Sequence, residues 1–264
     1  LECIEEGSGI QISGIAPGSQ SENVQLLYNR LHEKGQNPKY FDDYATMLDE
    51  LRPDIAVINC YFGDHAKVVL DALRKKIHVF VEKPVATTLT ELESIREVYS
   101  KSEVFLSMML GTRYTPWFMT ALIAVRRGDI GTIRLMNAQK SYKLGNRGEH
   151  YKKRGTYGGT IPWVGSHAFD CLYLFSGEKF ISVHASHSSC FNQGNGDMES
   201  TALCHFTMTN EVFASVSIDF LRPNISAVHD DDRLRIVGNK GIIEVRDSKV
   251  FLVALFNGNI TLRD

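Results

Sequence analysis

The chain has 264 residues, of which 43% are hydrophobic and 23% are charged, values typical of soluble globular proteins. The length predicts two modest domains or one large one. The formal net charge of −2 argues against a nucleic-acid or membrane partner, and no apolar run approaches the roughly 20 residues that span a bilayer. Five cysteines without a C-x-x-C pair indicate reduced thiols in a cytoplasmic protein.

Short apolar runs alternate with amphipathic stretches through the first half of the chain. Strands are predicted at residues 10–15, 54–60, 77–81 and 104–107. Helices are predicted at 21–34, after Asp64 as a cap, and after a capping box at 90–93. This alternation is typical of a parallel, doubly wound α/β sheet, in which ligands bind beyond the carboxyl ends of the strands.

The start of a dinucleotide-binding fold is missing from this pattern. Such a fold begins with a strand, a G-x-G-x-x-G turn and a helix. The sequence contains no G-x-G-x-x-G, residues 7–9 (GSG) lead into a strand, and residues 1–6 are similar to the end of a helix. We therefore expect further residues upstream in the working protein.

The pattern changes near residue 110, which predicts a domain of residues 1–110 followed by one of 111–264. A helix near 116–127 precedes longer alternating strands, among them 213–220. The turn sequence 238–241 (GNKG) predicts a hairpin of strands 233–237 and 242–245. With one further helix near 166–175, this is typical of an α+β domain with an open, mainly antiparallel sheet.

The tripeptide Glu82-Lys83-Pro84 directly follows the predicted strand 77–81. The strand brings Lys83 to its carboxyl end, where ligands are expected. A partly desolvated lysine loses its proton more easily and can hydrogen-bond a substrate hydroxyl, while Pro84 stiffens the turn. The alternative is a surface lysine at the end of a strand.

A second motif occupies residues 158–170 (GGTIPWVGSHAFD). The glycine pair lets the backbone approach a ligand closely, and Gly165 or Ser166 can begin a helix that carries His167 and Asp170 on one face. A histidine is suited to accept a proton while hydride leaves a carbinol carbon. The alternative is a histidine that caps or packs the helix.

These elements, in this order, resemble the glucose–fructose oxidoreductase, inositol dehydrogenase and rhizopine-catabolism (Gfo/Idh/MocA) family. The resemblance runs through nearly the whole chain and is carried by DIAVINCYFGDH, HVFVEKPVATTLTE, GTRYTPWF, RRGDIGTIR, GGTIPWVGSHAFD and VGNKGIIEV. It implies a Rossmann-type parallel sheet, an open C-terminal sheet, NAD or NADP as cofactor, and a homodimer or homotetramer formed through the C-terminal sheet.

The resemblance also implies roles by position. Lys83 matches the lysine that contacts the substrate hydroxyl and the nicotinamide, and His167 matches the catalytic acid/base. The cofactor-binding positions that the resemblance implies are Tyr61, Phe62, His65, Glu82, Lys83 and Arg113, while Ala16 and Ser19 are candidates because they follow the strand 10–15, where dinucleotide folds bind the ribose. For the substrate the resemblance implies Tyr114 and Asp170, of which Asp170 is more suited to an orienting or structural role. Trp163 and Lys140 are further substrate-binding candidates from the residues themselves.

Two positions depart from the family pattern. The family commonly has an aspartate four residues before the histidine, where this chain has Trp163. Its ring can stack on a sugar or an aromatic substrate, or it can be packing. Dinucleotide folds often place an acid after the strand 10–15 to bind the ribose of NAD. Residues 16–19 (APGS) hold neither an acid nor an arginine, so NAD and NADP both stay open, and Ser19 or Ser21 can bind the ribose or cap the helix.

Residues 140–154 are basic, with tyrosines interleaved. One interpretation is a mobile loop that grips an anionic substrate, such as a sugar acid or phosphate; the other is a solvated charged loop. Residues 230–232 (DDD) are expected to form a solvated turn, and the histidines lack the spacing of metal ligands, so no metal is predicted.

The sequence therefore predicts an oxidoreductase that transfers hydride between NAD or NADP and a hydroxyl carbon of a sugar or polyol. Lys83 holds the hydroxyl and His167 takes its proton, so both side chains must reach the same substrate carbon. That carbon must also lie within about 3–3.5 Å of the reacting atom of the cofactor. Two alternatives stay open. One is a relative that uses NAD transiently during glycoside cleavage; the other is a catalytically silent binding or regulatory protein.

Overall fold

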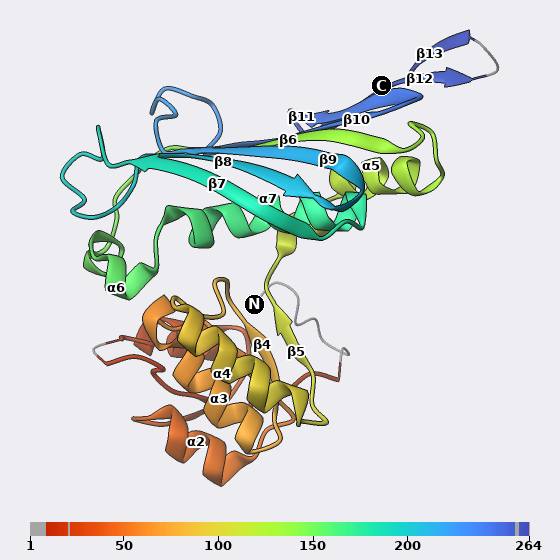
Figure 1. The fold of residues 1–264 in the computed structure, drawn as a ribbon. Coiled ribbons are helices and arrows are strands. Elements are labelled where there is room, and N and C mark those ends of the chain that lie inside the picture. The colour runs from red at the N-terminus through yellow and green to blue at the C-terminus, as the bar shows by residue number, and fades with distance from the viewer. Residues whose placement is uncertain (1–8, 21, 257–258, 264) are drawn as a thin grey trace. The chain divides into compact units, whose positions relative to one another are not determined.

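The computed structural model of the chain describes residues 9–20, 22–256 and 259–263. The chain divides into two compact units, Leu1–Met109 and Leu110–Asp264, each of which is described by itself (Figure 1). Among the described helices, none has the length and apolar character required to cross a membrane.

The first unit is a parallel Rossmann-type sheet with helices, as the alternation of its elements predicts. β1 pairs with β2 in one ladder, and the strands of a second sheet lie in the order β3-β4-β5; every pairing is parallel. The strands are β1 (Gly14–Ile15), β2 (Lys39–Tyr40), β3 (Ile55–Ile58), β4 (His78–Val81) and β5 (Leu106–Met108). The helices are α1 (Gln25–Glu33), α2 (Tyr44–Leu51), α3 (His65–Arg74) and α4 (Leu89–Ser100), with a 3-10 turn, η1, at Phe62–Asp64.

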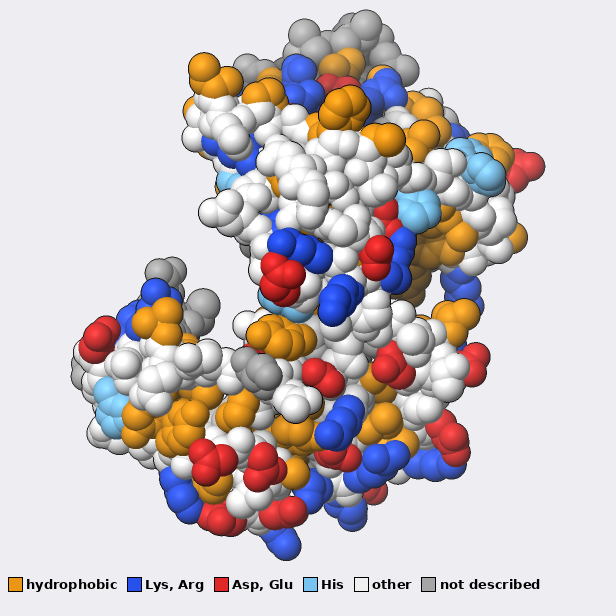
Figure 2. Space-filling view, turned by 90° about the vertical axis from the view of Figure 1, so that its left-hand side faces the viewer, with side chains coloured by type: hydrophobic (Ala, Val, Ile, Leu, Met, Phe, Trp, Pro, Cys, Tyr) orange, Lys and Arg blue, Asp and Glu red, His pale blue; other side chains and the backbone are white. Residues whose placement is uncertain are grey.

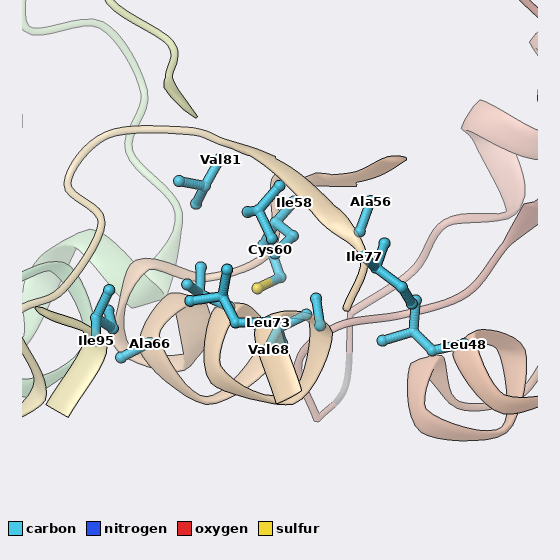
Figure 3. Packing of buried hydrophobic residues seen from close by; sticks show 13 residues of the cluster. Leu48, Ala56, Ile58, Cys60, Ala66, Val68, Leu73, Ile77, Val81 and Ile95 are labelled. Carbon is cyan, nitrogen blue, oxygen red and sulfur yellow. The ribbon is translucent and has the colours of Figure 1, made fainter. Parts of the chain in front are cut away.

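The core of this unit lies between the sheet β3-β4-β5 and α3. Ile58 and Val81, from neighbouring strands, pack in one cluster with Leu73 of α3, and all three are at most 4% exposed (Figure 3). A fully buried aliphatic side chain contributes about 1.5–3 kcal/mol. This core therefore fixes the carboxyl ends of β3 and β4, where the predicted site residues follow.

The capping predicted for the helices of the first unit needs correction. α1 begins at Gln25 without a side-chain cap, so Ser19 does not cap it. Asp64 is at the N-cap position of α3 but its side chain accepts no capping bond. The capping box is formed by Thr88 and Glu91, because the extended backbone of Thr88 aims its hydroxyl at the amide of Glu91. Ser21 and the expected helix end at residues 1–6 lie outside the described residues.

The second unit is an open sheet with the strand order β13-β12-β11-β10-β6-β9-β8-β7. All neighbouring strands are antiparallel except β6 and β9, which confirms the predicted mainly antiparallel sheet. Its strands are β6 (Ile133–Tyr142), β7 (Phe180–Ser188), β8 (Thr201–Met208), β9 (Val212–Asp219), β10 (Asp230–Gly238), β11 (Gly241–Arg246), β12 (Lys249–Phe256) and β13 (Asn259–Arg263). The helical elements are η2 (Gly111–Tyr114), α5 (Pro116–Arg126), η3 (Glu149–Lys152), α6 (Arg154–Tyr157), α7 (Thr160–Ser176) and η4 (Thr209–Glu211).

Helices cover one face of this sheet. α7 packs on β6, β8 and β9, and α5 packs on β11 and β12 (Figure 1). Met136 on β6, Val216 on β9 and Ile236 on β10 face the helices and are fully buried. The alternate residues of the same strands face away from the helices, and Leu135 and Phe213 among them are 39% and 45% exposed.

Two predictions in the second unit need correction. α7 begins at Thr160, not near Gly165 or Ser166, because Pro162 falls in its first turn, where a missing N–H costs nothing. Residues 230–232 do not form a solvated turn. They begin β10, since Asp232 pairs with Lys140 across the β6 ladder.

Candidate functional site

Three loops meet at the carboxyl edge of the first unit. Ser19, after β1, accepts a hydrogen bond on Oγ from the amide of Tyr61, 2.9 Å away. Gly18 lies so close to Cys60 that a Cβ there would be 2.7 Å from the Cβ of Cys60. The loops after β1 and β3 are thereby joined, at the edge where doubly wound sheets bind ligands.

The loop after β4 carries Lys83, which is 8% exposed. Its Nζ lies 3.5 Å from Oε1 of Glu82. His65 holds the next residue: its Nδ1 is 2.7 Å from the carbonyl oxygen of Pro84, and its Nε2 is 3.0 Å from that of Cys60. Such an ammonium can bind a hydroxyl with little freedom to move, because burial and the carboxylate restrict its positions.

The predicted cofactor positions of the first unit differ in exposure. Ala16 and Tyr61 are partly exposed, whereas Phe62 is 6% exposed and packs edge-on against the ring of His65. His65 is fully buried and both of its ring nitrogens contact main-chain oxygens. We therefore interpret His65 as a residue that positions the turn of Lys83, and direct contact with a cofactor would require this side chain to move.

An acid enters the loop after β1, where the sequence suggested none. Oε2 of Glu22 accepts hydrogen bonds from the amide of Gly18 at 2.8 Å and from that of Ser19 at 3.1 Å. The sequence places Glu22 three residues beyond the loop, so only the turn of the chain reveals that its carboxylate returns there. The sequence did not point to Glu22 as a candidate for this site.

In the second unit, His167 lies on α7, and a buried carboxylate holds the start of that helix. Glu199 is 3% exposed, and its Oε2 accepts a hydrogen bond from the amide of Thr160 at 3.0 Å. The same carboxylate pairs with Arg154 and with Nδ1 of His187. A carboxylate at a helix N-terminus satisfies free amides and complements the helix dipole. No local signal in the sequence indicated Glu199.

Arg113 and Asp170, predicted to bind cofactor and substrate, bind each other. Nε of Arg113 donates to Oδ2 of Asp170 at 2.7 Å, and a second bond joins Nη2 to Oδ1. This hydrogen-bonded pairing raises the pKa of Arg113. The bidentate pair joins η2 to the middle of α7, about one helical turn from His167. Tyr114, beside Arg113, is 72% exposed.

Lys140 is 3% exposed and forms an ion pair with Asp232 on the neighbouring strand. The hydroxyl of Tyr142 donates to the same carboxylate at 3.3 Å. Burial raises the pKa of Asp232 in spite of the ammonium beside it. Lys140 therefore already has a carboxylate partner, and a substrate anion would have to compete with Asp232 for it.

Trp163, at the position of the family aspartate, is 8% exposed. Its ring is stacked on Phe220, with ring centres 5.6 Å apart and planes 19° apart, and lies 4.7 Å from the ring of Tyr151. Much of its surface is thus used for packing within the second unit.

Over the rest of the described chain, few features point to other chemistry. No group of three or more histidine, cysteine, aspartate and glutamate side chains is arranged to hold a metal ion among the described residues. On the face of the molecule drawn in Figure 2, basic side chains lie among acidic ones and form no patch of one sign. This distribution matches the net charge of −2.

Comparison with known families assigns both units. The description "Oxidoreductase family, NAD-binding Rossmann fold" matches residues 5–110, and "GFO/IDH/MocA C-terminal domain" matches residues 118–244. The chain belongs to the Gfo/Idh/MocA oxidoreductase family. This confirms the family resemblance and assigns the first unit as an NAD-binding Rossmann domain.

Three relatives illustrate the range of this family. A solved structure from Thermotoga maritima, named only as an oxidoreductase, is 50% identical, with a TM-score of 0.94 over 100% of this chain and 80% of its own. Myo-inositol 2-dehydrogenase of Thermotoga maritima is 23% identical over 84% of this chain and 66% of its own length. Levoglucosan dehydrogenase in complex with NADH and L-sorbose shares the fold, with 16% identity and a TM-score of 0.82 over 96% of this chain and 70% of its own.

Proposed function

We propose that this oxidoreductase transfers hydride between a nicotinamide cofactor and a hydroxyl carbon of a sugar or polyol. The observation that carries the proposal is Lys83, a buried ammonium beside Glu82 at the carboxyl edge of an NAD-binding Rossmann sheet. Two of the relatives named above, myo-inositol 2-dehydrogenase and levoglucosan dehydrogenase, act on or bind compounds of this class. A lysine with only a structural role would not need to be buried at the edge where ligands bind.

In the proposed reaction, Lys83 donates a hydrogen bond to the substrate hydroxyl and fixes its direction. His167 accepts the hydroxyl proton while the carbon–hydrogen bond breaks, so that the alcohol becomes a carbonyl. A bound oxidised nicotinamide would supply the acceptor for the hydride. In the reverse direction His167 returns the proton to the carbonyl oxygen.

The test compares Lys83→Ala, His167→Ala and the double variant in the full-length protein, with formation of the reduced cofactor as the measurement. Each single variant should lose roughly 10²–10⁴-fold in kcat. The double variant should lose little more than the worse single one, because both residues act on one step. Lys101→Ala, which changes a lysine that is 71% exposed, serves as the matched control.

A kcat equal to that of the wild type in both single variants would contradict the proposal. Cleavage of a glycoside without net reduced cofactor would instead indicate the glycoside-cleaving alternative. A full-length protein that binds neither NADH nor NADPH would be a silent member of the fold.

We further propose NAD rather than NADP as the cofactor, on the strength of Glu22. Its carboxylate occupies the loop after β1, where dinucleotide folds hold the acid that binds the ribose hydroxyls. A 2′-phosphate there would meet a negative charge. Glu22→Gln should therefore improve kcat/KM for NADP more than for NAD, and an unchanged ratio of the two would contradict this preference.

The face of the second unit's sheet opposite α5 and α7 is proposed to bind a second copy of the chain. An apolar row crosses five strands on this face, from Phe213 through Leu135, Val237 and Ile242 to Val253. Phe213, Leu135 and Val253 are 45%, 39% and 41% exposed, and such rows are rarely left in water. Leu135→Lys should shift the mass measured by light scattering toward that of the monomer, and an unchanged mass would contradict this interface.

A further inference from the structure

Arg147 lies on three aromatic rings of the second unit. Its guanidinium carbon is 5.1 Å from the ring centre of Phe220, 5.4 Å from that of Trp163 and 5.7 Å from that of Tyr151. Trp163 and Phe220 are themselves stacked and are 8% and 3% exposed. We call these four residues the arginine–aromatic cluster.

No carboxylate balances Arg147 within the part of the chain that the structure describes. Its one hydrogen bond there runs from Nη2 to the carbonyl oxygen of Lys143 at 3.4 Å, and its Nε is buried without an acceptor. Burial lowers the pKa of Arg147. By contrast, Lys140, Lys152 and Arg154 of the same basic segment each pair with a carboxylate.

A half-buried cation without a counter-charge costs free energy until an anion approaches it. The aromatic faces stabilise the guanidinium but do not neutralise its charge. A planar set of donors is best matched by a carboxylate, which can accept two parallel hydrogen bonds. The cluster therefore has the properties of an anion site and not of a solvated loop.

The cluster is close to the predicted acid/base. Trp163 and His167 are four residues apart on α7, so their side chains are neighbours on one face of the helix, about 6 Å apart along its axis. An anion bound by Arg147 beside Trp163 would thus lie about one helical turn from the imidazole of His167. A sugar acid spans such a distance between its carboxylate and a secondary hydroxyl.

We propose that the substrate is a polyhydroxy carboxylic acid, an aldonate or a uronate, whose carboxylate is bound by Arg147. This inference rests on the proposed function, since it names the substrate class of the same reaction. A carboxylate is favoured over a phosphate ester because one guanidinium balances one negative charge, whereas a phosphate ester carries about −1.5 to −2 at neutral pH.

The test uses the full-length protein with its nicotinamide cofactor and two matched pairs, gluconate against glucitol and glucuronate against glucose. Arg147→Met removes the charge and keeps the stem, and should lower kcat/KM for the acids roughly 10–100-fold. For the neutral partners the change should stay below about threefold. Arg147→Lys should fall between the wild type and Arg147→Met for the acids, because it keeps the charge and loses the fork.

Lys153→Met is the matched control, because Lys153 is an exposed cation of the same segment outside the cluster. It should leave the preference for acids unchanged. Thermal unfolding midpoints of all variants identify any that fail to fold, in which case Arg147→Lys still carries the comparison. A wild type without preference for acids, or an equal loss on acids and neutral compounds in Arg147→Met, would overturn the inference and leave hydride transfer standing.

Calorimetric titration with gluconate and with inorganic phosphate separates the inference from the proposed function. If gluconate binds the wild type and not Arg147→Met, the result supports the anion site, even where none of the four compounds is turned over. The absence of turnover would then count against the proposed function alone. Gluconate binding that is absent in the wild type or unchanged in Arg147→Met would overturn the anion site. Tighter, Arg147-dependent binding of phosphate would overturn its assignment to a carboxylate.

Discussion

The turn of Lys83 and helix α7 carry the two predicted catalytic residues, and they are held in different ways. The buried ring of His65 holds the turn, because its two nitrogens contact the main-chain oxygens of Pro84 and Cys60. α7 is held by carboxylates: Glu199 binds its first turn and Asp170, on its middle, binds Arg113. The turn is therefore held by contacts to neutral main-chain oxygens, whereas α7 is held by carboxylates in ion pairs, and removal of one partner of such a buried pair is strongly destabilising.

The two regions also differ in the sequence distance that their contacts bridge. The contacts of His65 join residues 5 and 19 positions apart. Those of α7 join residues 39 and 57 positions apart, at Thr160–Glu199 and Arg113–Asp170. The first region is a local arrangement around two successive strands, whereas the second is held by contacts between segments that are far apart in the sequence. Substitutions around the turn of Lys83 should therefore mainly lower kcat, and substitutions in the contacts of α7 should mainly lower the free energy of unfolding.

The largest effect is expected for Glu199→Ala. Its carboxylate serves Thr160, Arg154 and His187 at once, so its removal should lower the free energy of unfolding of the second unit by about 2–4 kcal/mol. Both tryptophans, Trp117 and Trp163, belong to this unit. Urea unfolding followed by tryptophan fluorescence therefore measures it selectively.

Glu199→Gln is the matched control, because the amide keeps an oxygen for Thr160 and loses only the charge. It should cost clearly less than Glu199→Ala. Equal losses in the two variants would mean that the charge, and not the hydrogen bond to α7, is what holds this helix.

A smaller effect is expected for the Arg113–Asp170 pair. Asp170→Asn and Arg113→Lys should each cost about 1–2 kcal/mol, because each breaks the bidentate geometry of a pair whose carboxylate side chain is 9% exposed. The two changes together should cost less than their sum. Additive losses in a double-mutant cycle, measured by the same urea titrations, would show that the two residues do not act as a pair.

The sequence predicted most of the fold, for reasons that are local. The strands predicted at 54–60 and 77–81 form over Ile55–Ile58 and His78–Val81, because these residues are largely apolar and β-branched, and the turn 238–241 forms a hairpin because its glycines and asparagine favour one. Helix starts were predicted less well. Pro162 and Gly165 resemble a loop, yet both lie in α7, since tertiary bonds from Glu199 extend the helix to Thr160.

The candidate site was predicted where its residues share a local motif and missed where they meet across the sheet. Lys83 and His65 follow strands whose ends can be predicted, so their place at the carboxyl edge could be inferred. The pairing of Lys140 with Asp232 bridges 92 positions, and the aromatic neighbours of Arg147 come from separate elements. Neither set has a spacing that a single sequence reveals.

In the first unit, His65→Ala should cost about 1–2 kcal/mol, less than Glu199→Ala, because it removes two contacts to neutral main-chain oxygens. Its larger consequence should be kinetic. A loosened Lys83 turn misplaces the ammonium, so kcat should fall roughly 10–100-fold while KM for the cofactor changes little. His65→Gln, which can restore one donor, should recover part of kcat, and a variant with normal kcat would refute the positioning role.

The smallest expected effect is a difference in cysteine labelling. The reactivity of the thiols reports on each unit separately and requires no substitution in either. Burial raises the pKa of Cys60 in the first unit to about 11 and that of Cys171 in the second to about 12, so both stay protonated at pH 8. Cys190 is exposed, and thiolates alone react with iodoacetamide. Peptide mapping of the native protein at pH 8 should therefore find Cys190 labelled and Cys60 and Cys171 unlabelled. After Glu199→Ala, labelling should increase at Cys171 and not at Cys60, because only the second unit opens; equal labelling of the two would mean that the units unfold together.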